Sequence, residues 1–110
     1  MIVVALLALF AVTEPVTAGP STNRWAEPTR GILAQHCGRC HLPNLPTSVP
    51  RALAVFDLTD TPWYGRLQND QFDDLMRRLE AIKSLPEADR AIVSDFVRCA
   101  RDRDCPPADR

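Results

Sequence analysis

The chain has 110 residues, of which 13 are basic and 14 acidic, so its formal net charge at pH 7 is −1. This length is that of one small domain, and the near-neutral charge argues against a nucleic-acid partner, which would need a basic surface. Almost all of the basic residues are arginines, which favour fixed contacts with carboxylates over a diffuse positive surface.

The N-terminus has the pattern of a secretory signal. Residues 1–12 are all apolar, and residues 16–19, Val-Thr-Ala-Gly, have the small side chains of a signal-peptidase site. We therefore predict a signal peptide over 1–18, a polar leader over 19–28, and export to the periplasm or another compartment outside the cytoplasm. No basic residue precedes the apolar run, which leaves an uncleaved anchor as the alternative, although a bilayer span needs ~20 apolar residues.

The first predicted helix covers residues 29–40, with Pro28 at its start, and it leads into the pattern C-x-x-C-H. Cys37 and Cys40 are three positions apart, so both sulfurs can lie on one helix face and reach the two vinyl groups on one edge of a porphyrin. His41 follows directly, and its imidazole can turn toward the iron. This spacing predicts covalent attachment of one haem c, with Cys37 and Cys40 as thioether residues and His41 as an iron ligand.

Two other kinds of site use a Cys-x-x-Cys pair. A redox dithiol needs a strand leading into the pair, whereas residues 31–35 have a helical pattern. A tetrahedral zinc site needs four sulfur or nitrogen ligands, and the C-x5-C spacing of the later cysteines is looser than in zinc fingers. The ligands available for zinc are Cys37, Cys40, Cys99, Cys105, His36 and His41.

Cys99 and Cys105 are left over if haem uses the first pair. In an exported protein these two cysteines can bridge, and we expect a disulfide that holds the C-terminal tail, residues 100–110, to the last helix. Two free thiols are the alternative.

The middle of the chain is rich in proline. Three prolines within residues 42–50 predict an extended loop, which could offer a backbone carbonyl to the Nδ1–H group of His41. Residues 51–58 are predicted to form a short helix or an irregular segment that lines the cofactor or the core. Trp63 and Tyr64 follow, and each could bond a haem propionate or pack in the core.

Two further helices complete the predicted fold, and no segment has a strand pattern. The first runs from a cap at Asn69 or Asp70 to about Lys83, and the second opens with a capping box at Ser84 and continues to about Arg98. The earlier of these helices carries one apolar stripe, formed by Phe72, Leu75, Met76, Leu79 and Ile82. The predicted fold class is therefore all-α.

Residues 32–41, Ile-Leu-Ala-Gln-His-Cys-Gly-Arg-Cys-His, and a closing helix over 85–97 resemble the small class I monohaem c-type cytochromes. The resemblance implies a cytochrome c-like domain over residues 29–99, in which three to four short helices pack around one covalently bound haem. It also implies contact between the first and last helices, with His41 as the proximal ligand.

The same family usually supplies a methionine ligand from a loop ahead of the last helix. Here residues 83–86 lead straight into that helix, and Met76 is the only methionine outside the signal. We therefore predict Met76 as the sixth iron ligand, with core packing of Met76 and an open sixth position as the alternative.

By this resemblance the chain would be an exported one-electron carrier, with redox proteins as transient partners and no enzymatic activity of its own. Some of its arginines would hold the haem propionates or surface carboxylates. One alternative is a pentacoordinate haem protein that binds a gas or peroxide, and another is an accessory haem domain of a larger oxidoreductase.

Overall fold

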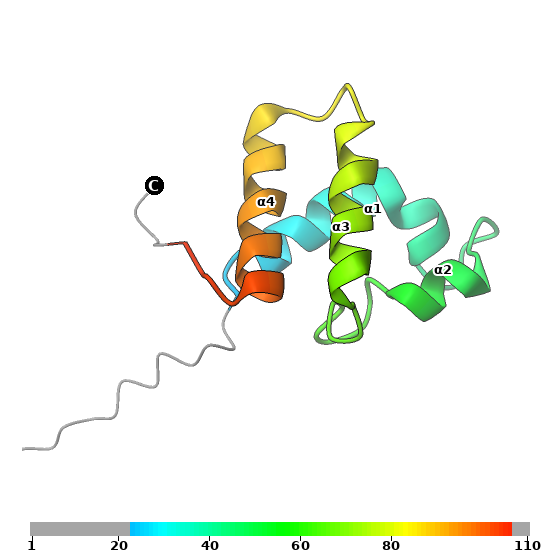
Figure 1. The fold of residues 1–110 in the computed structure, drawn as a ribbon. Coiled ribbons are helices and arrows are strands. Elements are labelled where there is room, and N and C mark those ends of the chain that lie inside the picture. The colour runs from blue at the N-terminus through cyan, green and yellow to red at the C-terminus, as the bar shows by residue number, and fades with distance from the viewer. Residues whose placement is uncertain (1–22, 107–110) are drawn as a thin grey trace, which may run out of the picture.

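A computed structural model describes residues 23–106, and this part of the chain contains four helices and no strand (Figure 1). The helices are α1 (Ala26–His41), α2 (Pro50–Val55), α3 (Asn69–Glu80) and α4 (Glu87–Asp102). The all-α prediction is confirmed. The predicted signal peptide lies outside the described residues, and no helix within 23–106 is long and apolar enough to cross a membrane.

Helix α1 begins earlier than the sequence pattern predicts. Its first residue is Ala26, whose N–H donates to the Asn23 carbonyl at 3.0 Å, so part of the predicted leader is helical. Pro28 therefore lies in the first turn, where the N–H groups have no helical partner and its missing donor costs nothing. At the other end, Gly38 is buried so close to Leu42 that an added Cβ would lie 3.0 Å from Leu42 Cδ1.

The predicted caps of α3 and α4 are wrong by one or two residues. Gln68, instead of Asn69 or Asp70, caps α3, and its backbone N–H donates to the Gln71 side-chain oxygen at 2.8 Å. Pro86, instead of Ser84, precedes α4. The Pro86 carbonyl accepts from the N–H groups of Asp89 and Arg90, both at 3.0 Å, so α4 begins without a side-chain cap.

The C-terminus of α3 is closed by a residue from α4. Helix α3 ends at Glu80, three residues before the predicted end, and Arg90 Nη1 donates to the Leu79 carbonyl at 2.8 Å. Arg90 Nη2 bonds the Ile82 carbonyl. The last carbonyls of a helix lack intrahelical donors, so one guanidinium both caps α3 and ties it to α4.

Helix α4 packs against both α1 and α3, and α1 also packs against α2 (Figure 1). The expected contact between the first and last helices is therefore present. The core centres on Phe96 of α4, which is 0% exposed. The Phe96 ring lies 4.9 Å from the Trp63 ring, 5.1 Å from the Tyr64 ring and 6.1 Å from the Phe72 ring, measured between centroids.

Trp63 is fully engaged in this core. Its indole Nε1 donates to the Ala26 carbonyl at 3.1 Å, so the loop before α3 is joined to the start of α1. This bond uses the donor that could otherwise reach a haem propionate. Trp25 is half-buried and also packs against the core.

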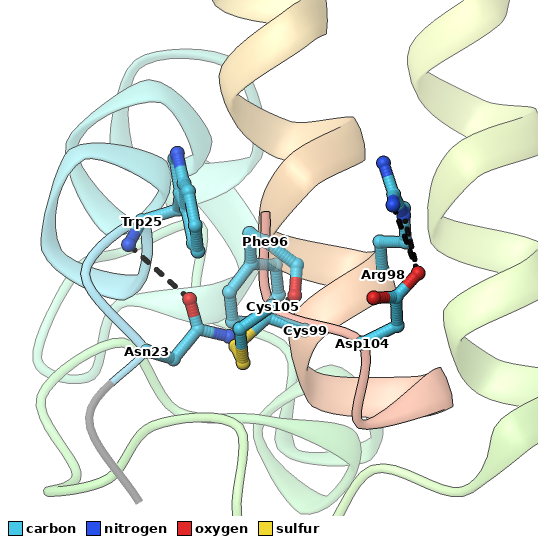
Figure 2. The surroundings of a disulfide bond; sticks show 7 residues. All are labelled: Asn23, Trp25, Phe96, Arg98, Cys99, Asp104 and Cys105. Carbon is cyan, nitrogen blue, oxygen red and sulfur yellow. Dashed lines mark hydrogen bonds and ion pairs between the residues drawn. A yellow bond between two sulfur atoms is a disulfide. The ribbon is translucent and has the colours of Figure 1, made fainter. Parts of the chain in front are cut away.

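The C-terminal tail is joined to α4 by the predicted disulfide between Cys99 and Cys105 (Figure 2). Arg98 reinforces the link, because its Nε and Nη2 atoms lie 3.0 and 2.8 Å from one carboxylate oxygen of Asp104. Helix α4 continues to Asp102, beyond its predicted end at about Arg98. A four-cysteine zinc site is ruled out, since these two sulfurs are bonded to each other.

Replacing Cys99 and Cys105 together with serine is expected to lower the free energy of unfolding by about 2 kcal/mol, because the open chain gains the entropy that this short loop removes from the unfolded state. Urea unfolding of the oxidised proteins measures the difference. Ser94→Ala, an exposed position on the same helix, is the control and should change stability by less than about 0.5 kcal/mol. Equal midpoints for wild type and the serine variant would contradict the expectation.

Candidate cofactor site

A cavity of about 680 Å³ lies between α1, α2 and α3. Its volume is within the range of roughly 300–1,000 Å³ that is typical of cofactor and ligand sites. Cys37, Cys40 and His41 all line it, so the structure brings together the three residues predicted from the C-x-x-C-H spacing. His36 also lines the cavity and is exposed at its mouth.

Both thiols belong to the last turns of α1, and both are half-buried and unbridged. Burial raises the pKa of the Cys37 thiol, the nearby positive charge of Arg78 partly opposes this, and Cys40 adds to the rise. A redox-active dithiol depends on a lowered thiol pKa, which stabilises the thiolate. The surroundings of Cys37 therefore disfavour the redox interpretation of the pair.

The zinc interpretation finds no support either. Within residues 23–106, no group of three or more His, Cys, Asp or Glu side chains is placed to hold a metal ion.

The imidazole of His41 is held in one orientation by Phe56. Nδ1 lies 2.9 Å from the Phe56 carbonyl oxygen, and the two rings stack with centroids 3.6 Å apart and an angle of 5° between their planes. A carbonyl only accepts, so Nδ1 carries the proton and Nε2 of the neutral ring keeps its lone pair. A histidine that ligates a metal through one nitrogen commonly donates the other N–H in this way.

The predicted donor loop over 42–50 does not supply this carbonyl. Residues 42–49 are non-helical but form turns instead of an extended loop, and Pro50 already begins α2. Phe56 follows α2 and is 15 positions from His41. Two backbone hydrogen bonds hold the segment around α2 against the end of α1. Val49 N–H donates to the Cys40 carbonyl at 3.3 Å, and Leu58 N–H donates to the His41 carbonyl at 3.1 Å.

The deep walls of the cavity are apolar. Leu75 and Leu79 of α3 are 5% and 2% exposed, and Phe56 is also buried. Gln71, Asp74 and Arg78 also line the cavity from α3, but each is partly or largely exposed. A group that enters the cavity would therefore meet hydrocarbon at depth and polar side chains near the solvent.

Met76, the predicted sixth ligand, does not line this cavity. It lines a second cavity of about 270 Å³ between α3 and α4, together with Glu87 and Arg90. Consecutive residues of a helix point about 100° apart, so Leu75 and Met76 face different neighbours. The structure thus separates Met76 from the cavity that holds Cys37, Cys40 and His41.

Two unpaired cations lie on the cavity wall. Arg51 of α2 and Arg78 of α3 line the cavity, and neither forms an ion pair or side-chain hydrogen bond with any other part of residues 23–106. Asp74, the acidic residue of the wall, is paired with Arg77. Both arginines are exposed, so the solvent-facing part of the cavity wall favours anionic groups.

Arg51, Arg78 and the Phe56 carbonyl are parts of the site that the sequence pattern did not predict. Arg78 lies three positions after Leu75, which places it on the same face of α3. That spacing identifies Arg78 as a cavity residue only when this face of α3 is already known to border the cavity. For the Phe56 carbonyl the sequence holds no local signal, because the contact depends on how α2 returns the chain.

Comparison with known proteins adds no relative. No family model matches the chain, and neither a curated protein nor a solved structure matches it. The interpretation of the cavity therefore depends on the chemistry and placement of its own residues.

Proposed function

We propose that this chain binds one haem c covalently through Cys37 and Cys40, with His41 as an axial ligand, and that it serves as an exported one-electron carrier. The observation that carries the proposal is the His41 Nδ1 to Phe56 carbonyl bond of 2.9 Å, formed beside two thiols that line the same cavity. This bond fixes the orientation of the ring and leaves Nε2 free to act as the ligand atom.

The cavity suits a large flat apolar group. Its volume of about 680 Å³ is that of a cofactor site, and Leu75, Leu79 and Phe56 supply buried hydrocarbon walls. Such walls exclude water and lower the local dielectric, which are means by which a protein tunes the potential of a haem. When bound, the haem supplies one-electron chemistry at its iron.

The cations of the cavity wall suit the carboxylates of a haem. Haem carries two propionates, and Arg51 and Arg78 are wall residues without partners among residues 23–106. Arginine binds carboxylates through paired N–H donors, so each could hold one propionate. Other arginines, such as Arg98 and Arg101, already pair with carboxylates elsewhere on the surface.

The arrangement of the helices supports the same proposal. The contact of α1 with α4 is the one that the resemblance to class I c-type cytochromes implies, and the C-x-x-C-H residues form the C-terminal end of α1. The Cys99–Cys105 disulfide agrees with an oxidising, exported location. Redox proteins that meet the chain through small transient interfaces would be its partners.

The placement of Met76 favours a second candidate, a haem protein whose iron keeps an open coordination position. Both candidates share the attachment through Cys37 and Cys40, and they differ in what occupies the face of the haem opposite His41.

The test is the haem content of the full chain, purified from a host that matures c-type cytochromes. The protein should keep its colour after acid-acetone extraction, give the pyridine haemochrome spectrum of a thioether-linked haem, and gain the mass of one haem. A redox titration should then follow a one-electron curve. A colourless product of unmodified mass would overturn the proposal, and a haem that cannot be reduced reversibly would overturn the carrier role.

A further inference from the structure

The α3 wall of the cavity carries an inference that rests on the proposed haem. We infer that this wall, centred on Leu75, leaves the second axial position of the iron to a small neutral diatomic ligand, of the class of carbon monoxide and nitric oxide, instead of to a side chain. The inference starts from the placement of Met76, which lines the separate cavity between α3 and α4.

Among residues 23–106, the other side chains with suitable ligand atoms are accounted for. Tyr64 packs against the ring of Phe96 and does not line the cavity. Cys37, Cys40 and His41 make the proposed attachment, and His36 lies on the same helix and is exposed at the mouth. A helix that supplies both thioethers and the proximal imidazole cannot also cover the opposite face of the ring. Lys83 is exposed and does not line the cavity.

The chemistry of the wall selects the class of ligand. Leu75 and Leu79, which are buried, offer no hydrogen-bond donor to an anion and no acid or base to a peroxide. The cations of the cavity wall, Arg51 and Arg78, are exposed and lie nearer the solvent. The acidic side chain of the wall, Asp74, is 46% exposed and is paired with Arg77. A neutral diatomic molecule loses little on entering hydrocarbon surroundings, whereas an anion would pay a large desolvation cost there.

The first measurement is the optical spectrum of the reduced holoprotein with and without carbon monoxide. Carbon monoxide should bind to the reduced iron and shift the haem bands, since no side chain has to be displaced from the iron. An unchanged spectrum would overturn the inference. The haemochrome assay separates this failure from failure of the proposed function, because it reports attachment whatever occupies the axial position.

Two neighbouring substitutions on α3 test whether Leu75 faces the iron. Leu75→His should give a six-coordinate, low-spin spectrum and weaken carbon monoxide binding by about tenfold or more, as expected when an internal ligand occupies the site about nine-tenths of the time. Met76→His, one position along the helix, is the matched control and should bind carbon monoxide like wild type.

Three outcomes bear on this comparison. If Leu75→His lowers the yield of folded protein, Leu75→Met serves in its place, because methionine and leucine have similar volumes. A methionine sulfur at this position should also compete with carbon monoxide and weaken its binding. Met76→Leu should leave the spectrum unchanged, and a gain of carbon monoxide binding in that variant would overturn the inference by identifying Met76 as a ligand. Azide that binds the oxidised protein as tightly as carbon monoxide binds the reduced one would overturn the assignment to neutral ligands.

Discussion

A chain in which Cys37 and Cys40 are both replaced by alanine is expected to purify without covalently attached haem. The two thiols line the cavity beside His41, and each thioether needs one of these sulfurs, so removing both leaves no covalent link. Haem extraction with acid-acetone and the intact mass measure the result. The expected effect is complete loss, the largest functional change that any substitution in this chain should produce.

The Cys99→Ser/Cys105→Ser variant is the matched control for this loss. It also removes two sulfurs, but they are bonded to each other at the far end of α4 and do not line the cavity. This variant should keep its covalent haem and lose only stability. Covalent haem in the Cys37/Cys40 variant would show that the C-x-x-C-H residues are not the attachment site.

Replacing Phe96 with alanine is expected to lower the free energy of unfolding by about 3–5 kcal/mol. The side chain is 0% exposed and touches the rings of Trp63, Tyr64 and Phe72, so its removal leaves a cavity where α4, α3 and the loop before α3 meet. A small domain is stable by only about 5–15 kcal/mol, so a large part of the population could unfold. Urea unfolding followed by circular dichroism measures the loss.

Leu45→Ala tests whether the Phe96 effect comes from burial. Leu45 is also apolar but is 43% exposed on the loop before α2, so its truncation should change stability by less than about 0.5 kcal/mol. Comparable losses in the two variants would mean that the core is not centred on Phe96. The distinction matters for the site, because this core holds α3, and with it the Leu75 wall, against α4.

The sequence alone was enough for those parts of the protein whose cause is local. The grouping of Cys37, Cys40 and His41 follows from positions 37 to 41 at the end of one helix, and helical spacing keeps neighbours three or four positions apart on one face. The all-α class follows from apolar periodicity. The Cys99–Cys105 bridge joins residues only six positions apart, so its partners are also near in sequence.

Only the tertiary structure decided which carbonyl orients His41 and what Met76 faces. The Phe56 carbonyl is 15 positions away and reaches Nδ1 because α2 reverses the chain against α1. Leu75 and Met76 belong to one apolar stripe of α3. Leu75 lines the cavity beside α1 and α2, whereas Met76 lines the cavity between α3 and α4. Periodicity predicts that a stripe is buried, and the packing of the helices determines which of its residues borders which neighbour.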